Sequence, residues 1–310
     1  MPETTPAVGG TPGGLPDGSA DRGFAATVAV GGGAVAAVGG YGPSGVDRRP
    51  PRRRREGGVL RSRGVRIALG AVIPLVLLAA WQLASTVGGV APSVLPSPEM
   101  VVTAAFDLAE RGLLGLYVAI STQRVLLGFA AGAAIGLLLG AVVGLSRFAD
   151  ALLAPTLGAI RTVPSLAWVP LLVIWFGIGE DSKVILIAIG AFFPVYTIVA
   201  AALHHVDRQL LEAGRAFGLR GVRLFTAVQL PAVVPSVLSA LRLALAQSWL
   251  FLVAAELIAS SMGLGFLLSD SGNNGRVDRI FLAIILLAVL GKLTDGVLGL
   301  VERWAVKRWA

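Results

Sequence analysis

The stretch EAGRAFGLRGVRLFTAVQLP, residues 212–231, lies between two long apolar segments of the chain. Its charged side chains are not stable in hydrocarbon, so the segment that carries them, 204–231, must protrude into water; we call it the polar loop. Good helix formers precede Gly218, which permits a bend, and Pro231 suits the first turn of a following helix. We therefore predict a short helix, a turn and a short helix between two membrane spans. Such an element can receive force outside the membrane and pass it inward.

The composition is typical of an integral membrane protein. Hydrophobic residues make up 55% of the chain and charged residues only 14%, whereas soluble domains carry about 25% charged residues. Cysteine is absent, and the two histidines, His204 and His205, are adjacent and point to different helix faces. We predict no metal site and no cofactor. The net charge of +8 gathers before the first span, which indicates contact with anionic lipid rather than nucleic acid.

Six apolar segments approach the length of about 20 residues that a membrane-spanning helix needs. They are 67–87, 125–145, 165–178 with its flanks, 184–203, 233–259 and 280–301. An amphipathic stretch over 101–116 predicts an interfacial helix before the second span.

The two ends of the chain differ in composition. Residues 1–58, rich in Gly, Pro and Arg, predict a disordered cytoplasmic tail, and residues 59–310 a membrane domain. Nineteen Lys and Arg lie on the side of the termini and the polar loop, against four on the other side. This bias predicts that both termini and the polar loop are cytoplasmic.

Five glycines at steps of four residues line one face of the second predicted span, where another helix backbone can approach closely. They are Gly128, Gly132, Gly136, Gly140 and Gly144. This face, the glycine face, predicts either packing within the chain or a seam between two copies of it.

Four ionisable residues fall inside the last two predicted spans: Arg242, Glu256, Lys292 and Asp295. An isolated charge costs about 2.5–3.5 kcal/mol or more at the bilayer centre, so each should face protein or a water-filled cavity. Lys292 and Asp295 can pair on one helix face, and Arg242 and Asp295 can approach at similar depth. Two interpretations stay open, a buried ion pair that fixes helix register and a lining of a translocation pathway.

No energy-converting chemistry is visible in the sequence. A phosphate-binding loop is missing, because Gly291-Lys292 is followed by Leu293 inside an apolar helix, and hydrolase signatures are missing too. We therefore predict a transport subunit and not an enzyme. Such a subunit is driven either by an ion gradient or by a separate ATPase, and the exposed polar loop favours a separate ATPase.

The polar loop resembles the loop of binding-protein-dependent ABC importer permeases, written E-A-A-x3-G-x9-I-x-L-P. The matching residues are Glu212, Ala213, Gly214, Gly218, Val228, Leu230 and Pro231, with full spacing, Gly214 in place of alanine and Val228 in place of isoleucine. Residues 161–165, 175–179, 193–194, 254–259, 263–265 and 291–295 are similar to the nitrate, sulfonate and taurine branch of those permeases.

The resemblance covers roughly residues 65–310 and implies an all-α integral membrane fold, the six-helix bundle of type I ABC importer permeases. It implies two permease subunits, expected to be a homodimer, with two ABC ATPase subunits and an extracytoplasmic solute-binding protein. In that assembly Glu212 to Pro231 would dock on the ATPase, with Arg215 and Arg220 adding polar contacts. Arg242 would be a candidate pathway contact for a small anion.

Other functions remain open on the sequence alone. The same importer class could carry a pyrimidine precursor of thiamine or another small solute. An ion-coupled secondary transporter is the alternative from another class, although such proteins usually show repeats and broken helices around midplane acids. A membrane-embedded enzyme or scaffold is disfavoured, because no catalytic constellation is present.

Overall fold

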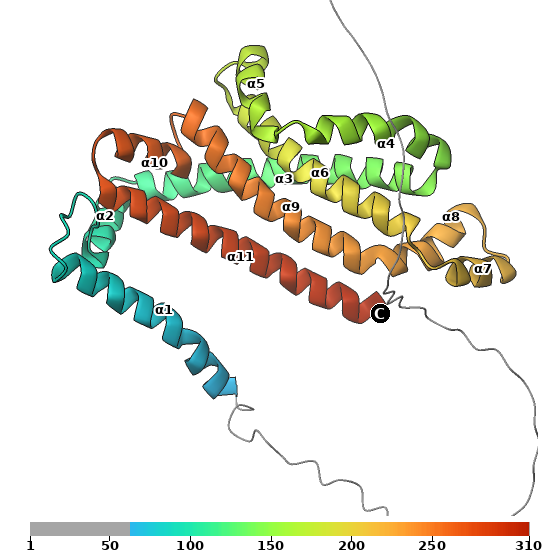
Figure 1. Cartoon of the computed structure of the whole chain (residues 1–310), viewed down its shortest axis with the longest axis horizontal. Coiled ribbons are helices and arrows are strands. Elements are labelled where there is room, and N and C mark those ends of the chain that lie inside the picture. Colours follow the sequence, from blue (N-terminus) through green and yellow to red (C-terminus); the bar gives the residue numbers. More distant parts are fainter. Residues whose placement is uncertain (1–62, 310) are drawn as a thin grey trace, which may run out of the picture. The chain divides into compact units, whose positions relative to one another are not determined.

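The computed structural model describes residues 63–309, and the tail predicted over 1–58 lies outside them. All regular elements within the described residues are helices (Figure 1). In chain order they are α1 (Arg63–Thr86), α2 (Pro98–Glu110), α3 (Leu113–Leu145), α4 (Arg147–Thr162), η1 (Ser165–Trp168), α5 (Val169–Phe176), α6 (Glu180–His204), α7 (Arg208–Ala216), α8 (Gly221–Leu224), η2 (Phe225–Gln229), α9 (Leu230–Ala259), α10 (Leu264–Asn273) and α11 (Val277–Trp309).

Four stretches of helix in the described part are long and apolar enough to cross a membrane: Leu113–Leu145, Glu180–His204, Gly221–Ala259 and Val277–Lys307. They contain the predicted spans 125–145, 184–203, 233–259 and 280–301. The first predicted span corresponds to α1, whose described apolar part, Gly70–Thr86, is shorter than the others.

The third predicted span, 165–178 with its flanks, has a break in its N-terminal flank. α4 and the segment Ser165–Phe176 are apolar together but bent by 86° at the break between them. Val163 is extended there, because the proline that follows disfavours helical dihedrals at the residue before it. The pair forms either a broken span or a loop that re-enters the membrane.

The interfacial helix predicted over 101–116 also has the wrong boundaries. α2 begins at Pro98, where the Ser97 side chain accepts a hydrogen bond from the Met100 N–H, and ends at Glu110. Gly112 then adopts a left-handed conformation with φ of 71°, which glycine tolerates best. The chain turns there, so the second span starts at Leu113 and not at 125.

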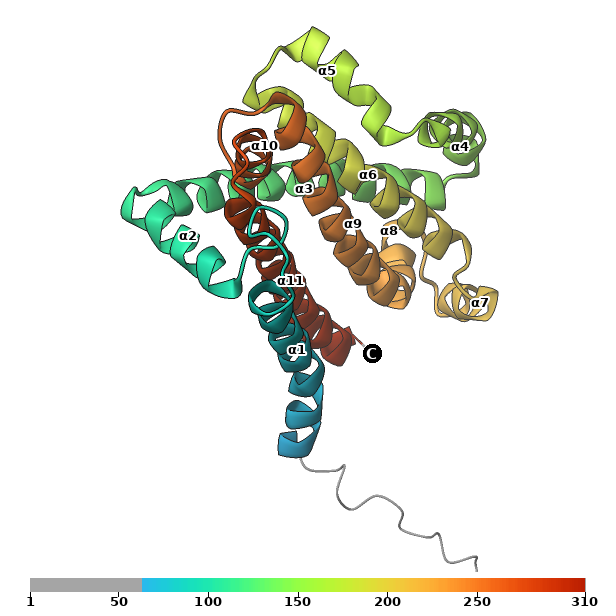
Figure 2. The same ribbon diagram turned by 60° about the vertical axis from the view of Figure 1, so that its left-hand side comes forward.

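The core lies where α3, α6 and α9 meet (Figures 1 and 2). Its fully buried side chains include Val125, Leu186, Ile187, Leu245 and Leu252. Lipid is as apolar as these residues, so close packing rather than exclusion of water holds such helices together.

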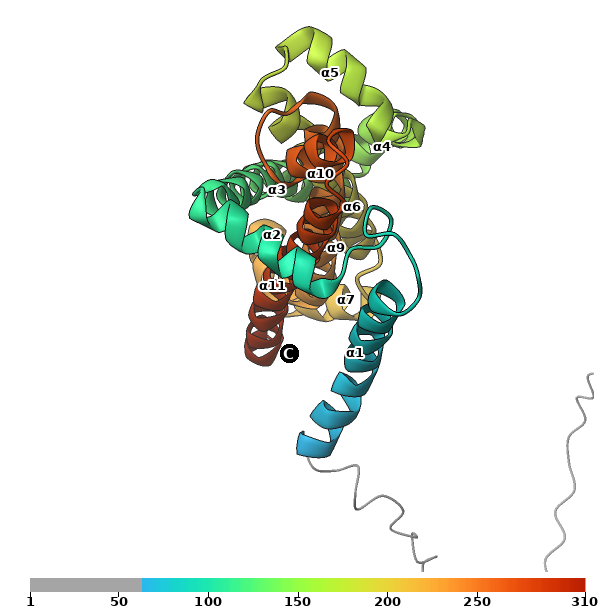
Figure 3. The same ribbon diagram turned by 90° about the vertical axis from the view of Figure 1, so that its left-hand side faces the viewer.

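A second cluster joins α2 and α10 to α11, with α2 lying across α11 in the view of Figure 3. Its buried members are Val101, Ala104, Leu108, Leu267, Leu282 and Ala283. Arg279 adds an ion pair to Asp107 at 2.9 Å. In Figure 1, α7 and α8 lie at one end of the long helices α6 and α9, and α10 lies near the other end of these helices. The helices α6 and α9 therefore connect the polar loop to the opposite end of the bundle.

Candidate functional site

The polar loop folds into a helix, a tight turn and a second helix. α7 begins after Asp207, whose carboxylate accepts a hydrogen bond from the Gln209 N–H at 2.8 Å. Gly218 ends the first helix with φ of +81°, a conformation that side chains with a Cβ adopt reluctantly. The next helix starts at Gly221 and runs to Ala259 through the π-helical turn η2. It therefore begins ten residues before Pro231, which is earlier than predicted.

Gly214 has a packing role that the family pattern does not explain. A Cβ placed there would lie 2.8 Å from Leu224 Cδ1 and 3.1 Å from Val228 Cγ2. The absence of a side chain thus lets α7 lie directly on α8 and the π-helical turn. Glycine in place of the motif's alanine therefore lets the two helices of the polar loop pack closely.

The outer surface of the polar loop combines apolar and charged side chains. Phe217 is 86% exposed and Val222 78% exposed, so the polar loop presents two large apolar side chains next to its charged ones. Glu212 and Ala213 are also exposed, whereas Leu230 and Pro231 are half-buried. A cavity of about 330 Å³ beside α7 is lined by Arg147, Leu203, His204, Val206, Arg208, Leu211, Glu212 and Arg215. This surface is suited to a protein partner.

The glycine face lies against α6 of the same chain. A Cβ at Gly128 would lie 2.6 Å from Ile187 Cβ, and one at Gly136 would lie 2.9 Å from the Phe192 carbonyl oxygen. Gly132, Gly140 and Gly144 meet the next turns of α6 in the same way. The two backbones can approach this closely only because the α3 residues lack side chains.

The charged residues predicted inside the last two spans do not form one site. Arg242 donates hydrogen bonds to both carboxylate oxygens of Asp295, at 2.8 and 2.9 Å, and to Glu302 at 2.9 Å. Lys292 is 85% exposed in its side chain, and its Nζ lies 3.8 Å from Asp295 Oδ2. Arg242 therefore ties α9 to α11. Glu256 lies apart from this group and belongs to another.

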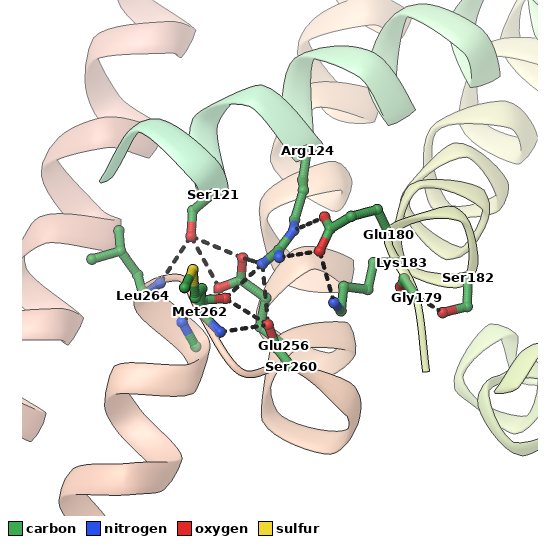
Figure 4. A network of polar contacts seen from close by, with 11 residues as sticks. Ser121, Arg124, Gly179, Glu180, Ser182, Lys183, Glu256, Ser260, Met262 and Leu264 are labelled. Atoms are coloured by element: carbon green, nitrogen blue, oxygen red, sulfur yellow. Dashed lines mark hydrogen bonds and ion pairs between the residues drawn. The ribbon is translucent and has the colours of Figure 1, made fainter. Parts of the chain in front are cut away.

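Glu256 is the centre of a buried charge network at the end of α9 that lies away from the polar loop (Figure 4). Its side chain is fully buried and accepts hydrogen bonds from Ser121 Oγ at 2.9 Å, Arg124 Nη1 at 2.6 Å and the Gly265 N–H at 2.7 Å. Ser121 Oγ in turn accepts from the Leu264 N–H at 2.8 Å. The carboxylate and the hydroxyl thus hold the first turn of α10 against α3 and α9.

The network extends to α6 through Arg124. The guanidinium donates from Nε and Nη2 to the two oxygens of Glu180, at 2.5 and 2.6 Å, and from Nη1 also to the Met262 carbonyl at 2.7 Å. Lys183 Nζ donates to Glu180 at 3.0 Å. The Arg124 and Lys183 side chains are only 4% and 5% exposed, whereas that of Glu180 is 62% exposed. The network thus contains two cations and two carboxylates, and its net charge is zero.

Sequence reasoning missed Ser121 and Arg124, because it began the second span at 125, and Glu180, because it began the fourth span at 184. The signal was an arginine one residue before a long apolar run, with an acidic residue, Glu256, known to need a partner in the membrane. Among residues 63–309, no group of three or more His, Cys, Asp or Glu side chains could hold a metal ion.

The family described as binding-protein-dependent transport system inner membrane component matches residues 132–307, more than half of the chain. The chain belongs to this family. It is therefore a multi-pass membrane component of an ABC importer rather than an enzyme, and it works with an ATPase and a solute-binding protein.

Two similar proteins are both described as putative aliphatic sulfonates transport permease protein SsuC. The one from Bacillus subtilis (strain 168) is 40% identical over 238 residues, which are 77% of this chain and 86% of that protein. The one from Escherichia coli (strain K12) is 43% identical over 238 residues, which are 76% of this chain and 90% of that protein.

A chain of the methionine ABC transporter MetNI, solved in an inward-facing conformation, has the same fold. The superposition has a TM-score of 0.56 at 23% identity and covers 64% of this chain and 98% of that one. The fold is thus the all-α bundle of type I ABC importer permeases.

Proposed function

We propose that this permease carries a small organic anion, with an aliphatic sulfonate as the first candidate, from the outside of the cell to the cytoplasm. The two similar proteins described as aliphatic sulfonate permeases support this substrate class. Taurine and nitrate-like anions belong to the same chemical range. We also propose that two copies of this chain pair with two ATPase subunits and that both termini and the polar loop are cytoplasmic.

The polar loop carries the proposed coupling to the ATPase. The observation behind this role is the pair of exposed apolar side chains, Phe217 and Val222, on a folded element between two membrane spans. An apolar anchor with charged neighbours is typical of the centre of a protein–protein interface. Because α9 continues from α8 without a break, ATPase movement at Val222 on α8 reaches the membrane through a continuous helix.

The coupling role is tested by Phe217→Ser. Loss of this anchor should cost at least about 2 kcal/mol of docking energy, which is roughly a 30-fold weaker association. We expect the ATPase to be lost during purification of the tagged permease and ATP-driven uptake to stop. Phe106→Ser is the matched control, since Phe106 is 65% exposed on α2, away from the polar loop. Equal retention of the ATPase by both variants would contradict the coupling role.

The orientation can be tested cleanly, because the chain has no cysteine of its own. Val222→Cys places a thiol on the polar loop, and Val94→Cys places one before α2, where the native side chain is 68% exposed. A membrane-impermeant maleimide added to intact cells should label only the second variant. Labelling of the first from outside would place the polar loop on the wrong side for an ATPase.

The substrate class is tested by growth and uptake. A strain that lacks this permease should lose growth on alkanesulfonates as the sole sulfur source and regain it when the gene is restored. Uptake that needs ATP supports the importer, whereas uptake driven by a proton gradient without ATP would favour an ion-coupled transporter. Growth loss confined to a thiamine-free medium would favour the pyrimidine precursor instead.

A further inference from the structure

A cavity of about 310 Å³ opens beside the buried charge network, at the end of the bundle away from the polar loop. It is lined by Ile120, Gln123, Arg124, Leu127, Glu180, Val184, Ser261 and Met262. Half of these residues are aliphatic or thioether side chains, and the others are polar or charged. The cavity therefore offers both an apolar wall and a cation.

The Arg124 guanidinium is held from behind by groups that do not depend on Glu180. Its Nη1 atom donates to Glu256 Oε1 at 2.6 Å, to the Met262 carbonyl at 2.7 Å and to Ser260 Oγ at 3.2 Å. The remaining donors, Nε and Nη2, point toward Glu180, whose carboxylate accepts from both (Figure 4) and which also lines the cavity. This paired arrangement is the geometry in which arginine binds planar or tetrahedral oxyanions.

Glu180 is a partner that can leave. Its side chain is 62% exposed, in contrast to the fully buried side chain of Glu256, so the Glu180 carboxylate itself can return to water. Its departure takes the carboxylate partner from Lys183, whose side chain is only 5% exposed, and a replacement anion would offset that cost. Without Glu180, the two cations, Arg124 and Lys183, keep only the Glu256 carboxylate, which pairs with Arg124, and the group carries a net charge of +1. A monovalent anion between the two cations would restore neutrality.

We propose that Arg124 is a binding group for the anionic head of the transported solute, and that Glu180 occupies the place of this head in the present structure. The solute class is an alkyl chain with a single sulfonate group: two sulfonate oxygens take the Arg124 donors, and the chain lies against Ile120, Leu127 and Val184. This inference rests on the proposed function, since it assigns a site to the organic anion that the permease would carry.

The test uses the purified permease–ATPase complex without the solute-binding protein, so that only a site on the permease is measured. Binding of radiolabelled butane-1-sulfonate is titrated at constant ionic strength to the wild type, Glu180→Gln and Asp181→Asn. Asp181 is the matched control, because it lies in the same first turn of α6 and is exposed but does not line the cavity. Both variants change the net charge equally.

We expect Glu180→Gln to bind butane-1-sulfonate at least about fivefold more tightly than the wild type, because a competitor for the site is weakened. Asp181→Asn should stay within about twofold of the wild type. Each methylene from methane- to butanesulfonate should tighten binding by up to about fourfold if the chain meets the apolar wall. Equal affinities of the two variants, or nitrate binding as tightly as butane-1-sulfonate, would overturn the proposal.

A second variant separates binding from structure. Arg124→Lys keeps a positive charge for Glu256 but cannot present two parallel donors. Combined with Glu180→Gln, it should weaken binding at least about tenfold relative to Glu180→Gln alone, while the complex still purifies intact. Unchanged binding in the combined variant would show that Arg124 does not hold the anion.

Failure of this inference and failure of the proposed function give different results. If the complete wild-type transporter imports alkanesulfonates but Glu180→Gln binds no more tightly than Asp181→Asn, only the site is wrong. If the wild type imports no alkanesulfonate although ATP hydrolysis is intact, the substrate class itself is wrong.

Discussion

Replacing Arg124 by alanine should destabilise the permease more than any loss of a surface charge. The substitution leaves the Glu256 carboxylate fully buried, with hydrogen bonds from Ser121 and Gly265 but without a cation in contact. Removal of one partner of a buried ion pair costs about 3–5 kcal/mol, because the remaining charge keeps its desolvation penalty. The Arg111 pair with Asp107, whose side chains are 60% and 34% exposed, contributes far less, because water screens it.

The assay is thermal unfolding of the purified permease in detergent, at one scan rate for all variants. At roughly 2–4 °C per kcal/mol, Arg124→Ala should lower the apparent Tm by about 6–20 °C. Arg111→Ala removes a cation that is exposed to water, in contrast to the buried Arg124, and should lower the apparent Tm by at most about 4 °C.

A double variant shows whether the stranded charge is the cause. Arg124→Met with Glu256→Gln leaves neither a buried cation nor a buried carboxylate, and the Gln side chain can still accept from the Gly265 N–H. This pair should therefore be less destabilised than Arg124→Ala alone. A Tm for Arg124→Ala less than about 2 °C below that for Arg111→Ala would refute the reasoning, and so would a double variant that is worse than the single one.

Three further outcomes follow from the packing and the charges. Gly132→Ala drives a methyl group into a backbone carbonyl of α6 and should cost about 1–3 kcal/mol, whereas Gly158→Ala, in open space on α4, should be neutral or stabilising in the same melting assay. Gly218→Val should lose the ATPase on co-purification, because φ of +81° costs a β-branched residue about 1–2 kcal/mol or more; Gly218→Asn, which tolerates that conformation, should retain it. The pKa of the Asp107 carboxyl lies below its ordinary value of 3.8, first because Arg111 donates a hydrogen bond to it. Its stabilising contribution should thus be present at neutral pH and vanish as the pH falls below about 4 through the lowered pKa, so that the Tm values of the wild type and Asp107→Asn converge there.

Residue type alone predicted the features that follow from solvation. Long apolar runs cannot lie in water and charged side chains cannot lie in lipid, so the helices at α3, α6, α9 and α11 and the polar loop between them could be recognised from the sequence. The spacing of four residues between the glycines of the glycine face predicted that another helix packs closely against it. Which helix that is could not be read from the sequence, because both α6 and a second copy satisfy the same pattern.

Features that depend on local geometry were not predictable in this way. A hydropathy window cannot register that the chain bends by 86° between α4 and Ser165–Phe176, where Val163 and Pro164 are not helical, or that Gly112 turns the chain and starts α3 twelve residues early. Arg124 was missed for the second reason. With the span taken to begin at 125, the Arg124 side chain was expected to be exposed to water, whereas in the structure it lies on α3 and is buried in the protein.

α6 and α9 connect the polar loop to the Arg124 network, and this connection limits how the permease can work. α6 begins at Glu180 and ends beside the polar loop, while α9 leaves the polar loop and reaches Glu256 after seven helical turns of about 5.4 Å each. Because Glu180 and Glu256 bind different atoms of the same guanidinium, a relative shift of the two helices by more than about 1 Å must lengthen one of the two hydrogen bonds beyond its normal range. Glu256 is buried and Glu180 is exposed, so the bond to Glu180 should break first. Force applied to the polar loop would then open the cavity side of Arg124, which is the side where the anion is proposed to bind.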